Sequence, residues 1–163
     1  LQERVNLGRA VIKEPINRLA REKMLVGSML AGMAFSNAPC AAVHALAYPI
    51  GAKFHVPHGL SNSLVLSKVL KFNSKNVADM YCEIAGDCLP ELKNKTIKVD
   101  DFVNGIERLI DDLKIPKLLR DVGINHNDIP KLADDAMKQQ RLLVNNPREL
   151  NLDDAIAIYE DAL

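Results

Sequence analysis

The feature that most constrains the fold is a long uncharged stretch in the first third of the chain. From Met24 to Ala52 the sequence contains no Asp, Glu, Lys or Arg. A segment of this length could cross a bilayer or form the buried part of a globular domain. The polar pair Ser36 and Asn37, followed by Pro39, interrupts its middle. Because such a break is unfavourable in a bilayer core, the stretch predicts two buried helices joined by a short turn and no membrane association.

Apolar residues recur three and four positions apart along most of the chain, which is the period of an amphipathic helix. No segment shows sustained alternation of period two. The sequence therefore predicts an all-α bundle of about eight or nine helices. We expect a long central buried helix from Pro15, a helix from about Pro39 to Tyr48, one that begins at Pro57, and one capped by Ser74.

Composition excludes several classes of function. A chain of 163 residues is expected to be one domain, and its 21 basic and 21 acidic residues cancel. This balance argues against binding to nucleic acid or to a membrane surface. The odd set of Cys40, Cys82 and Cys88, without a CxxC pair, favours a reduced, cytoplasmic protein. The chain opens on Leu and not Met, which suggests a piece of a longer polypeptide.

Three of the four histidines, His44, His55 and His58, fall among small and apolar residues. An imidazole in apolar surroundings is costly unless its nitrogens find partners, and a metal ion is one such partner. We expect His44 in the middle of one helix and His58 in the first turn of the next. The short loop between these helices is able to bring the two imidazoles together. Tyr48 lies one turn after His44 on the same face.

Two histidines do not complete a zinc or iron(II) site, which normally has three or more protein ligands. No Asp or Glu lies nearby, and the chain has no H-E-x-x-H motif. The other ligands would come from outside this stretch or from outside the chain. The residues alone leave two alternatives open: His44 as a core residue bonded to a carbonyl, and His58 as a residue that starts a helix.

Three motifs in this region resemble the signature of the iron-containing (group III) alcohol dehydrogenases. They are His44-Ala-Leu-Ala-Tyr-Pro-Ile-Gly, Val56-Pro-His-Gly-Leu-Ser-Asn-Ser and Leu70-Lys-Phe-Asn. Similar pieces flank them at Gly32–Asn37, Asp128–Ala133 and Asn146–Leu150. The resemblance covers most of the chain.

The resemblance implies a two-domain enzyme, of which residues 1–163 form the C-terminal helical domain, similar to that of dehydroquinate synthase. The N-terminal dinucleotide-binding domain, which would bind NAD or NADP, is expected to be absent from this chain. In the family one Asp and three His hold iron(II), or sometimes zinc. Two of these ligands carry over to His44 and His58. The Asp and His expected upstream have no counterpart before His44.

The implied activity is the interconversion of a small alcohol and its aldehyde by hydride transfer, with the fragment inactive alone. Tyr48 stands where many members carry His, so we expect either a hydrogen-bond donor to substrate or a packed aromatic. Phe35 and Phe54 are further candidates for an apolar substrate wall. The alternatives are a relative similar to hydroxyacid-oxoacid transhydrogenase or maleylacetate reductase, or a non-enzymatic helical interaction domain. The implied partners are the substrate, the chain's own N-terminal domain and, through an exposed apolar cleft, a second copy.

Overall fold

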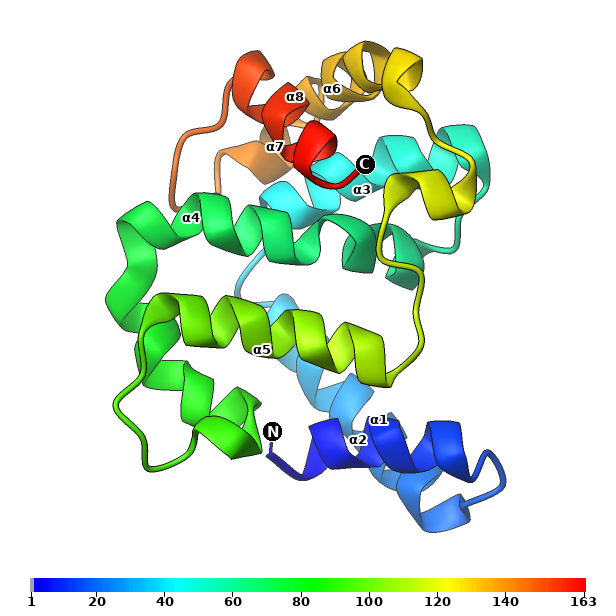
Figure 1. Ribbon diagram of the computed structural model, residues 1–163, viewed down its shortest axis with the longest axis vertical. Coiled ribbons are helices and arrows are strands. Elements are labelled where there is room, and N and C mark those ends of the chain that lie inside the picture. The colour runs from blue at the N-terminus through cyan, green and yellow to red at the C-terminus, as the bar shows by residue number, and fades with distance from the viewer. Residues whose placement is uncertain (1) are drawn as a thin grey trace. The chain divides into compact units, whose positions relative to one another are not determined.

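The computed structural model describes residues 2–163, with side chains from residue 7 onward. The described residues form eight α-helices and three short 3₁₀ turns and no strand, so the all-α prediction is confirmed (Figure 1). The helices are α1 (Gln2–Lys13), α2 (Arg18–Phe35), α3 (Ala42–Phe54), α4 (His58–Cys88), α5 (Val99–Asp112), α6 (Ile129–Met137), α7 (Gln140–Leu143) and α8 (Leu152–Asp161). The 3₁₀ turns are η1 (Pro90–Leu92), η2 (Leu119–Val122) and η3 (His126–Asp128).

The chain forms two compact units, each with its own packing. The first contains Leu1–Pro39 and Ala78–Lys114, and the second contains Cys40–Val77 and Ile115–Leu163. The boundary falls inside α4, where Val77 leaves helical geometry with φ −134° and ψ 28°.

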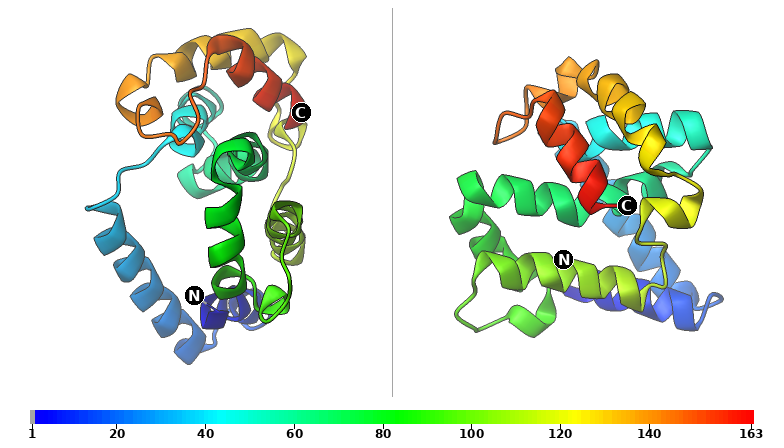
Figure 2. Two further views of the ribbon diagram at one scale, coloured as in Figure 1. Left: turned by 90° about the vertical axis from the view of Figure 1, so that its left-hand side faces the viewer. Right: turned by 45° about the horizontal axis from the view of Figure 1, so that its top comes forward.

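The second unit is built around α3. Helix α6 packs against both α3 and α8, and α6 lies beside α8 in each view of Figures 1 and 2. Tyr159 of α8 is fully buried, and its hydroxyl donates to the Leu46 carbonyl of α3 at 2.6 Å. This bond and the surrounding apolar contacts hold the helix that carries His44 and Tyr48. The largest fully buried neighbours are Leu46, Ile50, Leu64, Leu119, Ile124, Ile129 and Leu132.

The predicted end of α3 at Tyr48 is wrong, because the helix passes through Pro49 and continues to Phe54. Proline in a helix interior removes one backbone bond and costs about 3 kcal/mol. Here the helix is deeply buried on both sides of Pro49, with Leu46 and Ile50 at 0 % exposure. Packing therefore outweighs the local preference. The helix ends at His55, which takes the left-handed conformation with φ 56°.

The predicted break at Ser74 is also displaced, and the two predicted helices form one kinked element, α4. The Ser74 hydroxyl donates to the Lys71 carbonyl of the preceding turn at 2.7 Å instead of capping a new helix. At the other end, Pro57 immediately precedes the first turn of α4, and its carbonyl accepts from the Ser61 N–H at 2.9 Å. The predicted start at Pro57 is therefore correct within one residue.

Helix α2 of the first unit differs from the prediction of a central buried helix. It begins after Asn17, whose Oδ1 accepts from the Ala20 N–H at 3.0 Å, and not at Pro15. Most of its apolar side chains are exposed, including Leu25 at 71 % and Met29 at 58 %. Its apolar composition is that of a core helix, but the described residues do not cover it. No helix in the described part of the chain has the combined length and apolar character that a bilayer crossing needs.

Candidate metal centre

The two predicted metal ligands lie on consecutive helices of the second unit. His44 is in the first turn of α3, not in its middle as predicted, because the helix begins only at Ala42. His58 is the first residue of α4. A three-residue connection, His55–Pro57, joins the helices, and the left-handed His55 turns the chain sharply. His44 thus lies ten residues before the end of α3, whereas His58 directly follows the connection.

The imidazoles of His44 and His58 have ring centroids 5.2 Å apart, with planes inclined by 52°. Metal–nitrogen bonds of about 2.0–2.1 Å place an imidazole centroid about 3.2 Å from the ion. Two imidazoles at the tetrahedral angle of about 109° then have centroids about 5.2 Å apart. The spacing of this pair thus fits two nitrogen ligands of one cation.

The surroundings favour a neutral imidazole at His44. The side chain is half-buried, and its pKa is lowered first by burial and then by the charge of His58. A neutral imidazole keeps a lone pair free for a cation. His58 is exposed, so a ligand could reach the pair from solvent.

Tyr48 completes a triangle of rings with the two histidines. Its centroid lies 6.3 Å from that of His44 and 6.0 Å from that of His58. The ring packs against the buried core, and its hydroxyl has no hydrogen bond within the described residues. Both predicted roles, donor to substrate and packed aromatic, stay open.

The pair does not form a complete site by itself. Within the described residues, no group of three or more His, Cys, Asp or Glu side chains is placed to hold a metal ion. That further ligands come from elsewhere stays a prediction. His55, which stands between the two candidates in sequence, is exposed and serves as the residue that ends α3.

The sequence analysis missed Asn62, one turn after His58 on α4. Its Nδ2 lies 3.1 Å from the Nε2 of His58. Its Oδ1 is buried and has no hydrogen-bond partner among the described residues. The spacing of four positions on a predicted helix is the signal that could have identified this residue.

The two phenylalanines predicted to line the substrate wall lie in different units of the chain. Phe54 packs against the core at the end of α3, and the Lys53 ammonium lies 5.1 Å from its ring centroid. Phe35 ends α2 in the first unit and is 57 % exposed. Within the second unit, the ring of Tyr48 lies beside His44 and His58, and the role of Phe35 stays a prediction.

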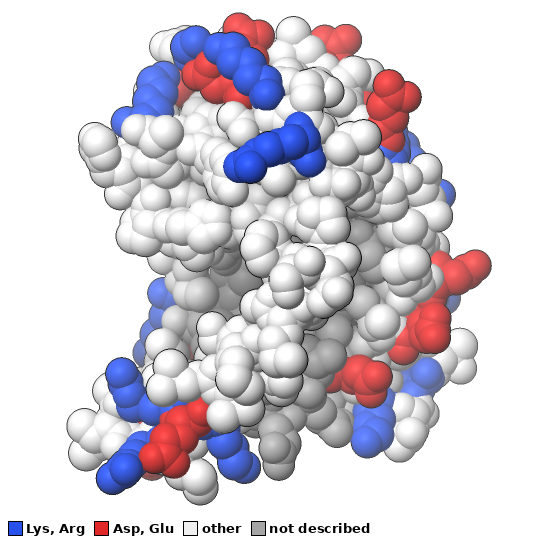
Figure 3. All heavy atoms as spheres, turned by 180° about the vertical axis from the view of Figure 1, so that it is seen from behind, with Lys and Arg blue, Asp and Glu red and all other residues white. Residues whose placement is uncertain are grey.

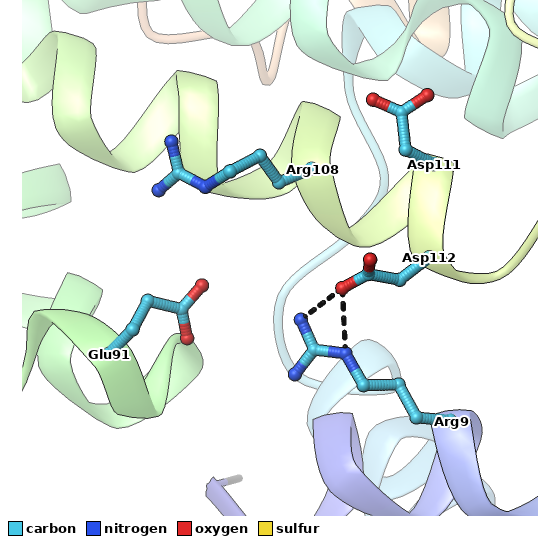
Figure 4. A pocket seen from close by; sticks show the side chains of 5 residues that line it. All are labelled: Arg9, Glu91, Arg108, Asp111 and Asp112. Atoms are coloured by element: carbon cyan, nitrogen blue, oxygen red, sulfur yellow. Dashed lines mark hydrogen bonds and ion pairs between the residues drawn. The ribbon is translucent and has the colours of Figure 1, made fainter.

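A separate, charged pocket lies within the first unit (Figure 4). Arg9 donates from Nε and Nη2 to the same Asp112 oxygen at 2.9 and 2.6 Å. Glu91, Arg108 and Asp111 form the rest of its wall. The wall thus carries both basic and acidic side chains, and the pair drawn between them is that of Arg9 and Asp112. On the face drawn in Figure 3, described basic and acidic side chains lie near one another around a broad area without charged side chains.

Comparison with known proteins matches residues 6–163 to the model of the Fe-containing alcohol dehydrogenase family, C-terminal. The chain is 38 % identical over 160 residues to long-chain-alcohol dehydrogenase 1 of Geobacillus thermodenitrificans, covering 94 % of this chain and 40 % of that protein. It is 35 % identical over 151 residues to lactaldehyde reductase of Escherichia coli K12, covering 88 % and 38 %.

Solved structures agree with the sequence matches. A crystal structure of 1,3-propanediol oxidoreductase superposes with a TM-score of 0.86 at 32 % identity, covering 98 % of this chain and 43 % of that one. The chain thus spans about two fifths of the length of these relatives. The family match and the helical fold lead to one conclusion: this chain belongs to the Fe-containing alcohol dehydrogenase family and corresponds to its C-terminal helical region.

Proposed function

We propose that this chain provides the metal-binding, substrate-side part of an NAD(P)-dependent alcohol dehydrogenase. The observation that carries the proposal is the 5.2 Å spacing of the His44 and His58 rings, which suits two ligands of one divalent cation. Iron(II) is the first candidate from the family description, and zinc accepts the same imidazole donors. One relative is named as an NADPH-dependent butanol dehydrogenase, which supports a nicotinamide cofactor.

In this proposal each residue has a defined task. His44 and His58 bind the cation through their neutral imidazoles, and Tyr48 offers its free hydroxyl to the oxygen of a small alcohol or aldehyde. A cation held by these two residues would supply Lewis-acid polarisation of that oxygen, which is the chemistry that hydride exchange with a nicotinamide would need. The remaining ligands and the dinucleotide site come from a part of the enzyme that has no counterpart in these residues.

Metal titration of the 163-residue chain and of its variants tests the two ligands. Zinc binding followed by calorimetry is expected to weaken at least about tenfold in His44→Ala and in His58→Ala, since even supporting residues of metal sites are worth 10–100-fold. His55→Asn is the matched control, because it removes a neighbouring imidazole and asparagine tolerates the left-handed backbone there. Equal zinc affinity in the parent chain and in both alanine variants would refute the proposal.

A second candidate function is a non-enzymatic helical interaction domain. The exposed apolar side chains of α2 favour it, with Leu25, Met29 and Met33 each more than half exposed. Under this alternative, the alanine variants of the two histidines behave as the parent chain does. Association measured by sedimentation is lost instead when Leu25 and Met29 are replaced by Lys.

A further inference from the structure

The side-chain amide of Asn62 makes a single hydrogen bond within the described residues, and that bond goes to a candidate metal ligand. Its Nδ2 lies 3.1 Å from His58 Nε2, while its Oδ1 is buried without a partner. The burial of the other end of the amide, and not the contact with His58 itself, indicates which way the amide faces. Turning the amide round would bury two unpaired N–H donors in place of one unpaired oxygen, and unpaired buried N–H groups are the rarer and costlier case.

The direction of this hydrogen bond determines where His58 keeps its proton. The amide Nδ2 is only a donor, so Nε2 of His58 must accept with its lone pair. A neutral imidazole with an accepting Nε2 carries its hydrogen on Nδ1. Asn62 thus selects one of the two tautomers of His58, in which the Nε2 lone pair is ready for a partner.

We propose that Asn62 is a positioning residue that occupies the Nε2 lone pair of His58 until a divalent cation takes it. The inference rests on the proposed function, since it concerns the same metal pair. A cation bound at Nε2 and the Asn62 amide use the same lone pair, so the cation displaces the amide. Asn62 loses no other hydrogen bond when it swings away, because the described residues give it none.

This competition determines whether the Asn62 hydrogen bond raises or lowers the affinity of the site for a divalent cation. A bond present only in the metal-free site stabilises that state and lowers the affinity for the ion. A neutral hydrogen bond contributes about 0.5–1.5 kcal/mol net, which corresponds to about 2–10-fold in the dissociation constant. Asn62→Leu keeps the approximate shape and removes the donor, so zinc is expected to bind it about 2–10-fold more tightly than the parent chain.

The opposite arrangement gives the opposite result. If the cation bound Nδ1 of His58, Nε2 would carry hydrogen, and Asn62 would support the ligand from behind by accepting that hydrogen. Its removal would then weaken zinc binding. Weaker or unchanged zinc affinity in Asn62→Leu therefore overturns the proposal, and tighter binding supports it.

A spectroscopic measurement tests the same contact without metal. The ¹⁵N shifts of the His58 ring, recorded at about pH 8 where an ordinary imidazole is neutral, distinguish the two tautomers. We expect hydrogen on Nδ1 in the parent chain. Asn62→Asp offers only acceptors and is expected to move the hydrogen to Nε2.

Asn76→Leu is the matched control, because it removes an amide from the same helix that donates to the Pro147 carbonyl. It is expected to leave the His58 ring shifts and the zinc affinity unchanged. A parent chain with hydrogen on Nε2 of His58 overturns the proposal. Failure of the parent chain to bind zinc refutes the proposed function, while the tautomer measurement still decides the role of Asn62.

Discussion

The hydrogen bond from Tyr159 to the Leu46 carbonyl offers a measurable link between the core and the candidate site. The donor sits on α8 and the acceptor on α3, two positions after His44 in the chain. We predict that Tyr159→Phe destabilises the second unit by about 1–2 kcal/mol, since a neutral buried bond is worth about 0.5–1.5 kcal/mol net and the carbonyl loses a partner in an apolar core. The ring itself stays, so the cost of a cavity is avoided.

This loss corresponds to a fall of about 2–8 °C in the melting temperature for a chain of this size. Chemical denaturation gives the free energy, and amide hydrogen exchange along α3 assigns the loss to that helix. Tyr48→Phe is the control, because its hydroxyl has no hydrogen bond among the described residues, and its change is expected to stay within about 0.5 kcal/mol. Equal stability of Tyr159→Phe and Tyr48→Phe, with unchanged exchange in α3, would refute the reasoning.

Two further predictions concern packing and pH. A Cβ at Gly105 would overlap the buried Leu89 side chain, so Gly105→Ala is expected to destabilise the first unit by about 1–3 kcal/mol in urea unfolding. Gly59→Ala, which meets nothing within 4 Å, is instead expected to stabilise by up to about 1 kcal/mol, and similar losses in both would contradict this explanation. The pKa of Asp128 is lowered chiefly by the hydrogen bond from Lys53 at 2.7 Å. The ionised carboxylate therefore stabilises the fold above the unfolded-state pKa of about 3.9, and this stabilisation is lost as the pH falls through the lower pKa of the folded state. The urea midpoint should therefore fall less steeply between about pH 7 and pH 2 for Asp128→Asn than for the parent chain. If the midpoint depended on pH equally in both proteins, the Lys53–Asp128 pair would not stabilise the fold.

The helical class was predictable because it depends on local periodicity, which each helix displays in its own sequence. The ends of helices were less predictable where tertiary packing opposes a local preference. Pro49 predicts a helix end, but the buried face of α3 carries the helix past it. Ser74 predicts a cap, but its hydroxyl finds an acceptor in the preceding turn.

Burial of α2 was not predictable from its own residues. Its composition specifies an apolar helix, yet whether Leu25 and Met29 are covered depends on which other elements lie beside them. The approach of His44 and His58 was expected from the short connection between their helices, although only His58 adjoins that connection and His44 lies at the far end of α3. Asn62 was missed because asparagine is not a metal ligand of the expected type. The role proposed for it follows only from the position of its amide beside His58.

The three-residue connection His55–Pro57 has a consequence for the order of folding. Contacts between residues close in sequence form with a small loop-closure entropy, whereas the joining of α8 to α3 must close a loop of most of the chain. His44 and His58 thus lie within one contiguous segment, formed by α3 and the start of α4, and are expected to approach each other early in folding. An insertion in this connection would change how α4 is placed against α3, and it would also disturb the core, because Val56 is buried there.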